Sequence, residues 1–242
     1  TSATCLGVEL RDGRWLGPRG LRLKQLAAGV RDLDQSRLAS PIALAAYLGM
    51  LTWNDLLNRP LLSCLHRAYG FARATPAHDC RVVSDAVLSE LLLNISLAPY
   101  WITDLERDWS STVLASDAAQ QFGYGCCQAK LDPTLIVQAA NFATSDPHHL
   151  RLQHLTSEEP EVTRAGPSMR LPLRQADFRT VFSIRAKHRT HAGAMEARAA
   201  ALALQRFTRT VRNHRKRLLM CVDAQAVLGA LRKGRSSSTS FR

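Results

Sequence analysis

The sequence predicts an α+β protein whose first part is helical and whose second part is a mixed β-sheet flanked by helices. Two observations predict this division. Apolar residues recur at the spacing of an α-helix through residues 20–98. In residues 111–231, by contrast, two short apolar runs each end in an aspartate, and an Ala-rich segment of high helical propensity lies between them. We therefore expect two domains, residues 1–100 and residues 111–242.

The first part is expected to begin with a hairpin and to continue as four helices. Leu6–Leu10 is typical of a strand, and Asp12-Gly13 is a hairpin turn signal. Ser40-Pro41 is typical of a helix start, because Ser caps a helix and Pro fits its first position. Trp101 and Trp109 bracket a tether, and we expect both to pack between the two domains. The expected helices cover residues 21–33, 41–57, 61–69 and 85–98.

The second part opens with a strand that carries an acid. Val113–Ala115 is apolar and is followed almost at once by Asp117, and then by Gly123-Tyr124-Gly125. This pattern predicts a buried strand with an aspartate at its end, a turn, and a second strand whose glycines allow close backbone approach. A further strand is expected over Phe178–Ile184.

Residues 131–178 contain five prolines among Asp, Ser and His residues, and this composition predicts a long irregular insertion. His148, His149 and His154 lie in this segment. Because no cysteine spacing accompanies them, we interpret them as loop histidines and not as metal ligands.

Two later segments supply further acids. His191–Phe207 is a predicted helix with Glu196 in its first turns. Arg217–Asp223 contains five apolar residues that run directly into Asp223, and Ala224–Leu231 is again helical in pattern. Each acid also has a plain structural interpretation. Asp117 and Asp223 could be turn or helix-cap acids, and Glu196 could be a first-turn acid favoured by the helix dipole.

The order of these elements resembles the ribonuclease H domain of retroelement reverse transcriptases. In that family the first strand carries an Asp, the first helix carries a Glu, and the fourth strand ends in another Asp. The corresponding residues here are Asp117, Glu196 and Asp223. The match covers roughly residues 111–242. It departs at Ala224, because Ser or Asn commonly follows the last Asp in the family.

The resemblance implies that Asp117, Glu196 and Asp223 are catalytic residues that bind two Mg²⁺ or Mn²⁺ ions. Hard oxygen ligands favour these ions over zinc, and two ions can hold the attacking water and the leaving oxygen of a phosphodiester. The implied activity is hydrolysis of the RNA strand of RNA–DNA hybrids. One alternative is a catalytically inactive nucleic-acid-binding module with the same fold. Another is a basic helical interaction protein whose acids never converge.

The first part resembles the thumb and connection that precede ribonuclease H in a retroelement polyprotein. Leu48–Trp53 and Arg59–Leu62 match the Leu-Gly-x-Leu-x-Trp and Arg-Pro segments of that region. We therefore interpret the chain as a polyprotein fragment, with the remaining parts of the polymerase as partners. No Tyr-x-Asp-Asp polymerase motif occurs, so DNA synthesis is not expected. The resemblance also implies a fourth acid beyond Arg242, so we expect the second domain to be C-terminally incomplete.

The charge of the chain indicates a polyanionic partner. Its net charge is +12, from 32 Lys and Arg residues against 20 Asp and Glu residues. Nucleic acid is the simplest such partner, and a solvated basic surface is the alternative. Some basic residues could instead favour a helix C-terminus. The residues expected to contact nucleic acid are Arg209, Arg212, Arg215, Lys216, Arg217, Lys233 and Arg235.

The six cysteines show neither a CxxC motif nor a Cys/His zinc spacing. We therefore expect buried thiols and a reducing intracellular compartment, the nucleus or the cytoplasm. No apolar stretch is long enough to span a membrane.

Overall fold

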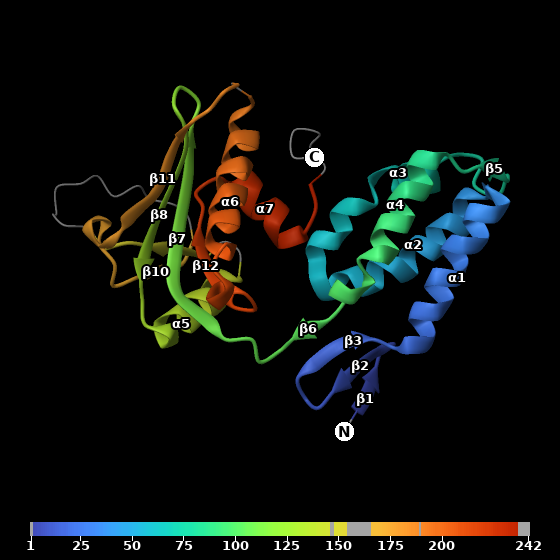
Figure 1. The fold of residues 1–242 in the computed structure, drawn as a ribbon, viewed down its shortest axis with the longest axis horizontal. Coiled ribbons are helices and arrows are strands. Elements are labelled where there is room, and N and C mark those ends of the chain that lie inside the picture. Colours follow the sequence, from blue (N-terminus) through green and yellow to red (C-terminus); the bar gives the residue numbers. More distant parts are fainter. Residues whose placement is uncertain (1, 146–147, 154–165, 189, 237–242) are drawn as a thin grey trace. The chain divides into compact units, whose positions relative to one another are not determined.

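The computed structural model describes residues 2–145, 148–153, 166–188 and 190–236. The chain divides into two compact units, which are described separately below (Figure 1). The first unit contains Thr1–Glu106 together with Gly229–Ser237, and the second contains Arg107–Leu228 together with Ser238–Arg242. The expected mixture of helices and sheets is confirmed.

The first unit begins with an antiparallel sheet. Its strands, in spatial order, are β1 (Ser2–Cys5), β2 (Val8–Arg11), β3 (Trp15–Pro18) and β6 (Thr103–Asp104). The hairpin turn at Asp12-Gly13 is confirmed, and both residues have positive φ, 51° and 67°. The expected strand over Leu6–Leu10 is wrong at its start. Leu6 and Gly7, with φ of 50° and 82°, form a second turn of the same kind.

Helices form the rest of the first unit. They are α1 (Gly20–Ser36), α2 (Pro41–Asp55), α3 (His66–Ala72) and α4 (Asp85–Ser96), with a short pair of strands β4 (Leu38–Ala39) and β5 (Arg81–Val82). The predicted cap at Ser40 is confirmed, and Ser84 caps α4 in the same way. Ser40 accepts a hydrogen bond from the Ala43 N–H at 3.3 Å, and Ser84 accepts one from the Val87 N–H at 3.4 Å.

The expected single helix over residues 61–69 is wrong. The chain instead forms a 3₁₀ segment, η1 (Leu56–Cys64), which is kinked at Asn58 with φ of −144° and ψ of 80°. Pro60 lies inside this segment and has no N–H to donate, so a continuous α-helix is disfavoured there. A second 3₁₀ turn, η2 (Ala98–Tyr100), follows α4.

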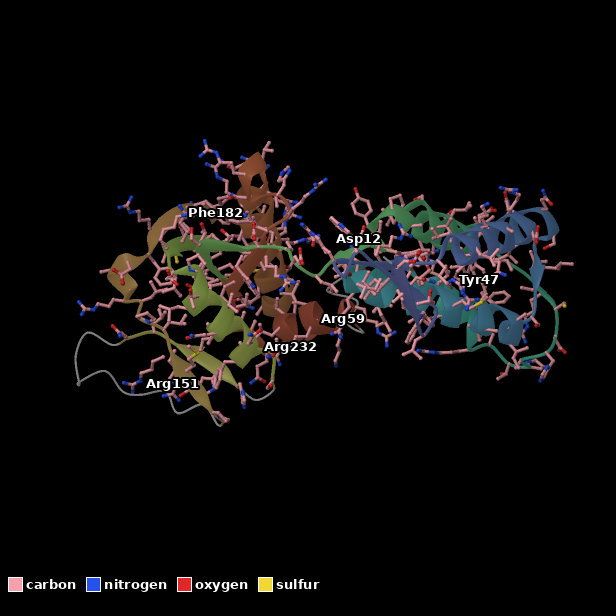
Figure 2. All side chains as sticks on the ribbon, turned by 90° about the horizontal axis from the view of Figure 1, so that it is seen from below. Asp12, Tyr47, Arg59, Arg151, Phe182 and Arg232 are labelled. Carbon is pink, nitrogen blue, oxygen red and sulfur yellow. The ribbon has the colours of Figure 1, made fainter. Side chains whose placement is uncertain are left out.

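Two polar side chains are bonded inside the helical core of the first unit. Tyr47 lies among the helices of the first unit (Figure 2). It donates its hydroxyl to the Leu26 carbonyl at 2.6 Å. Asp55 is fully buried and accepts from Trp101 Nε1 at 2.7 Å and from Asn94 Nδ2 at 3.1 Å. Trp101, which is also fully buried, therefore belongs to this core. Our expectation that it packs between two domains is wrong, because Asp55 offers its indole N–H a partner within the first unit.

The second unit is built on a four-stranded sheet in the order β11-β8-β7-β12. Strands β7 (Trp109–Ala119), β8 (Gly123–Lys130) and β11 (Arg179–Arg185) are antiparallel neighbours. The last strand, β12 (Arg217–Cys221), runs parallel to β7. Parallel neighbours need a crossover connection, and part of that connection is helix α6 (Ala192–Thr208). Helix α7 (Gln225–Lys233) follows β12.

Alternate residues of β7 serve the two faces of this sheet. Leu114 packs with Ala203 and Phe207 of α6. Val113 packs on the other face with Ile136 and Ala139, which belong to helix α5 (Pro133–Ala143). The second unit therefore has an apolar core on each side of its sheet, covered by α5 on one side and by α6 on the other (Figure 1).

Our expectation that residues 131–178 are irregular is wrong for the described part. This segment contains α5, the parallel pair β9 (His149–Arg151) and β10 (Ser168–Arg170), and a 3₁₀ turn, η3 (Gln175–Asp177). Asp132 starts α5 by accepting a hydrogen bond from the Thr134 N–H at 2.8 Å. Pro133 occupies the first helical turn, where a missing N–H costs nothing.

The loop histidines also differ in part from the expectation. His148 stacks on Phe142 with ring centroids 4.6 Å apart, whereas His149 lies in β9. His154 lies outside the described residues.

Candidate functional site

Three carboxylates reach one place from three different elements of the second unit. Asp117 lies near the end of β7, and Asp223 lies two residues beyond the last residue of β12, Cys221. Because β7 and β12 run parallel, their ends lie at the same edge of the sheet. Glu196 comes from the early part of α6, which packs on β7.

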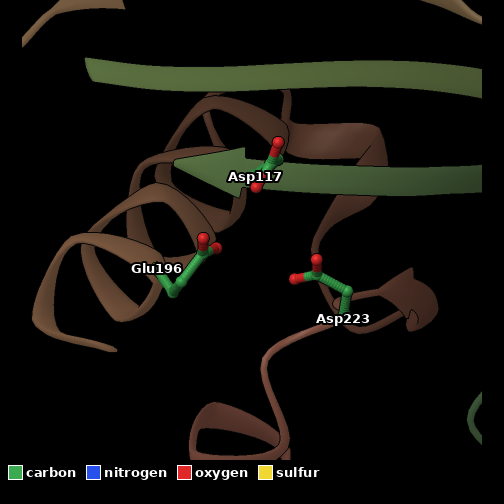
Figure 3. Close-up of side chains that lie close together, drawn as sticks. All are labelled: Asp117, Glu196 and Asp223. Carbon is green, nitrogen blue, oxygen red and sulfur yellow. The ribbon is translucent and has the colours of Figure 1, made fainter. Parts of the chain in front are cut away.

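The three acids predicted from the sequence do converge. One carboxylate oxygen from each of Asp117, Glu196 and Asp223 lies within 4.8 Å of the other two. Figure 3 shows the side chains pointing into one space between the end of β7, helix α6 and the segment after β12. This distance contradicts the interpretation in which the acids never meet.

The pKa of Glu196 is raised by its surroundings. Burial, together with the charges of Asp117 and Asp223, raises the pKa of its carboxyl to about 7. One backbone group opposes this effect, because the Ala118 N–H donates to Glu196 Oε1 at 3.3 Å. The same N–H donates to Asp117 Oδ1 at 2.7 Å. Ala118 therefore holds two of the three carboxylates from the backbone, a role that no side-chain pattern in the sequence could indicate.

The local structure does not favour a purely structural role for Glu196. It is the fifth residue of α6 and so lies beyond the first turn, where the helix dipole stabilises acids most. Its Oε2 atom is buried and has no hydrogen-bond partner among the described residues. No ion pair with Lys, Arg or His joins any of the three acids in the part of the chain that the structure describes.

The donor set fits a hard divalent cation. Carboxylate oxygens are the ligands that Mg²⁺ and Mn²⁺ prefer. A cation would also neutralise the mutual repulsion that raises the Glu196 pKa, and it would give the buried Oε2 a partner. Asp117 and Asp223 are exposed, so the cluster is open to solvent on their side.

The predicted nucleic-acid contacts fall into three groups. Arg209, Arg212 and Arg215 are exposed at and beyond the C-terminal end of α6. Two neighbours have structural partners, because Lys216 pairs with Asp108 at 2.7 Å and Arg217 lies 5.8 Å from the centroid of the Trp109 ring. The last two, Lys233 and Arg235, belong to the first compact unit, whereas the acids belong to the second.

Positive charge is concentrated in one part of the chain. Residues 1–106 contain 11 Lys and Arg residues and 10 Asp and Glu residues, whereas residues 107–242 contain 21 and 10. The net charge of +12 is therefore almost entirely a property of the region that carries the acid cluster.

Comparisons of this chain with models of protein families, with curated proteins and with solved structures found no match. No helix within the described ranges is long and apolar enough to cross a membrane. The five cysteines whose side chains are described are all free thiols. Burial raises the pKa of both Cys126 and Cys221 to about 11, which lowers the fraction of reactive thiolate at neutral pH.

Proposed function

We propose that residues 111–242 are a ribonuclease H-like domain that hydrolyses the RNA strand of RNA–DNA hybrids with two bound Mg²⁺ or Mn²⁺ ions. The observation that carries this proposal is the convergence of Asp117, Glu196 and Asp223 within 4.8 Å. In this proposal the whole chain is the thumb, connection and ribonuclease H segment of a retroelement reverse transcriptase polyprotein.

The topology of the second unit supports the proposal. The resemblance implies a mixed sheet whose first strand and fourth strand each deliver an Asp. In the described sheet, β7 carries Asp117, and β12, the fourth strand of that sheet along the chain, leads to Asp223. One departure is that α5, β9 and β10 come between the second and third strands of this sheet, so α6 is not the first helix of the unit.

The residues present can perform the required positioning. Bound divalent ions would supply an activated water and stabilise the leaving oxygen of the phosphodiester. Asp117, Glu196 and Asp223 would hold the ions through their clustered oxygens. The Ala118 N–H fixes Oε1 of Glu196 and leaves Oε2 available as a ligand. Exposed arginines would hold the sugar-phosphate backbone, so the hybrid would be selected by its shape and 2′-OH groups and not by base sequence.

Cleavage of a labelled RNA–DNA hybrid by Asp117→Asn tests this proposal. The substitution removes one carboxylate charge and keeps the side-chain shape, so we expect Mg²⁺-dependent cleavage to be lost. Asp79→Asn is the matched control, because Asp79 is an exposed acid of the first unit, and we expect it to cleave like the wild type. Unchanged cleavage by Asp117→Asn would rule out the proposed role of the acids.

A catalytically inactive nucleic-acid-binding module with the same fold is the second candidate. The excess of basic residues after residue 106 favours it, because binding to phosphates needs charge but no acid cluster. This candidate predicts duplex binding that weakens steeply with salt, and no cleavage at any concentration of Mg²⁺ or Mn²⁺. Binding that does not depend on salt would count against both candidates.

A further inference from the structure

Four exposed arginines lie within ten residues at and beyond the C-terminal end of α6. They are Arg206, Arg209, Arg212 and Arg215, which we call the arginine platform. Among the described residues, none of the four has a hydrogen-bonded or acidic partner for its side chain. Val211, in the middle of the platform, is 77% exposed, so an apolar side chain is presented to solvent beside the charges.

The platform is a defined surface and not a loose loop. Residues Val211–Asn213 form a 3₁₀ turn, η4. Asn213 Nδ2 donates to the Phe207 carbonyl at 2.7 Å, and His214 Nε2 lies 2.7 Å from the Thr208 carbonyl. At its far side the segment is joined to the start of β7, where the Arg217 N–H donates to the Asp108 carbonyl at 2.7 Å.

Two of the four arginines, Arg212 and Arg215, have no role in stabilising the end of α6. Cations near a helix C-terminus normally bond its free carbonyls or balance its dipole. Here the side chains of Asn213 and His214 already meet the last carbonyls of α6. Arg212 and Arg215 lie beyond the helix end, where the effect of the dipole has faded. Four like charges so close together repel one another, and an external polyanion would relieve this repulsion.

We propose that the arginine platform is a second backbone-binding surface, which holds the phosphates of a nucleic-acid duplex away from the acid cluster. This inference rests on the proposed function. Glu196 and Arg209 are separated by 13 residues of α6 and its cap, which at 1.5 Å per residue is roughly 20 Å. For a duplex that lies along α6, with a rise of 3.4 Å per base pair, the platform would meet the duplex about six base pairs from the cleaved phosphate.

Fluorescence anisotropy of a 12-base-pair RNA–DNA hybrid in EDTA, where no cleavage can occur, tests the platform. The test variant is Arg209→Gln/Arg212→Gln/Arg215→Gln. The matched control is Arg31→Gln/Arg67→Gln/Arg73→Gln, which removes three exposed arginines of the first unit. We expect the slope of log K against log salt to become shallower by about 3 in the test variant and by less than about 1 in the control. Equal effects in both variants would overturn the proposal.

Two further measurements separate the possible outcomes. Vesicles of phosphatidylserine replace the hybrid in the same assay. If the test variant loses vesicle binding but keeps the wild-type slope on the hybrid, the platform binds membranes and the proposal is wrong. The melting temperature of each variant shows whether it is folded, and a single Arg212→Gln variant, with an expected slope change of about 1, replaces the triple variant if that one is unfolded.

The dependence of KM on the length of the hybrid tests the distance between the acid cluster and the arginine platform. Hybrids of 4 and 12 base pairs extend about 14 Å and 41 Å, so only the longer one reaches from the acids to the platform. In the wild type we expect a lower KM for the longer hybrid and a similar kcat for both. In the test variant the two KM values should converge. If the wild type cleaves neither hybrid, the proposed function fails, and the anisotropy experiment still decides whether the platform binds nucleic acid.

Discussion

Each unit of the protein contains a carboxyl group whose pKa is raised by burial. The two carboxyl groups differ in their hydrogen-bond partners. Asp55 in the first unit is fully buried, and Trp101 and Asn94 donate hydrogen bonds that oppose the rise in its pKa. Glu196 in the second unit lies beside two further acids and keeps one buried oxygen without a partner among the described residues. The Asp55 carboxylate therefore has internal hydrogen-bond donors, whereas we propose a bound cation as the partner of the free Glu196 oxygen.

The two parts of the chain also differ in net charge and in the number of exposed hydrophobic side chains. Residues 1–106 are almost neutral, and among the described residues 14 of their large hydrophobic side chains are exposed. Residues 107–228 show only four such side chains. The excess of positive charge therefore lies after residue 106, whereas most of the exposed large hydrophobic side chains among the described residues lie before it.

The largest expected effect on stability follows from removal of the buried Asp55 carboxylate. Asp55→Ala leaves the Trp101 indole N–H and the Asn94 amide without their buried acceptor. We expect a loss of about 3 kcal/mol in the free energy of unfolding of the first unit, measured by urea denaturation with Trp fluorescence. Asp79→Ala, an exposed acid of the same unit, should change it by less than about 0.5 kcal/mol. Equal values for the two variants would remove the distinction between Asp55 and a surface acid.

We expect Glu196→Gln, unlike Asp55→Ala, to raise the free energy of unfolding of the metal-free protein. Removing this charge relieves repulsion from Asp117 and Asp223, so the metal-free protein should be more stable by up to about 1 kcal/mol. The same variant should lose most of the stabilisation that Mg²⁺ gives to the wild type. Thermal unfolding with and without Mg²⁺ measures both effects. A variant that is destabilised in EDTA and still responds fully to Mg²⁺ would show that Glu196 serves the fold.

The pKa of Glu196 predicts how stability changes with pH. Its folded pKa of about 7 lies above its ordinary value of 4.5, so the folded state holds the proton more tightly. The resulting stabilisation is fully present below pH 4.5 and is lost as the pH rises through 7. The melting temperature in EDTA should therefore fall between about pH 4.5 and pH 7, less so in Glu196→Gln, and Mg²⁺ should reverse the fall. Parallel curves for wild type and variant would assign the change to other groups.

The smallest expected effects on stability distinguish a basic residue with an acidic partner from one without a partner among the described residues. Lys216→Ala breaks an ion pair with Asp108, whose side chain is 76% exposed, and should cost about 0.5 kcal/mol at low salt. Arg212→Ala should cost nothing measurable, because no described residue is its partner. Urea denaturation at low and high salt makes the comparison. A larger loss for Arg212→Ala would show that the arginine platform has a structural role.

The acids could be predicted from the sequence because each follows or lies within a recognisable element. Asp117 and Asp223 follow apolar runs, and Glu196 lies in an Ala-rich helix. Their convergence follows from the parallel pairing of β7 and β12, which places both strand ends at one edge. The pattern could not show the Ala118 N–H between two carboxylates, because a backbone donor carries no residue signature.

The wrong predictions concern residue types that occur in more than one kind of local structure. Pro133 is one of the five prolines that predict an irregular segment, yet it occupies the first turn of α5, whose apolar residues Ile136 and Ala139 pack on the sheet. Pro60, which was expected just before a helix, instead lies inside a kinked 3₁₀ segment. Trp101 was assigned to a boundary, because the sequence cannot show that distant Asp55 accepts its N–H.

Binding of Mn²⁺ to the wild type and to Asp117→Asn/Asp223→Asn tests the central claim most directly. Electron paramagnetic resonance of free Mn²⁺ reports binding without any need for cleavage. If Asp117, Glu196 and Asp223 form a metal centre, the wild type should take up Mn²⁺ in competition with Mg²⁺, and the double variant, with the same far-ultraviolet circular dichroism, should not. Equal Mn²⁺ uptake by the two proteins, or none by the wild type, would contradict the account.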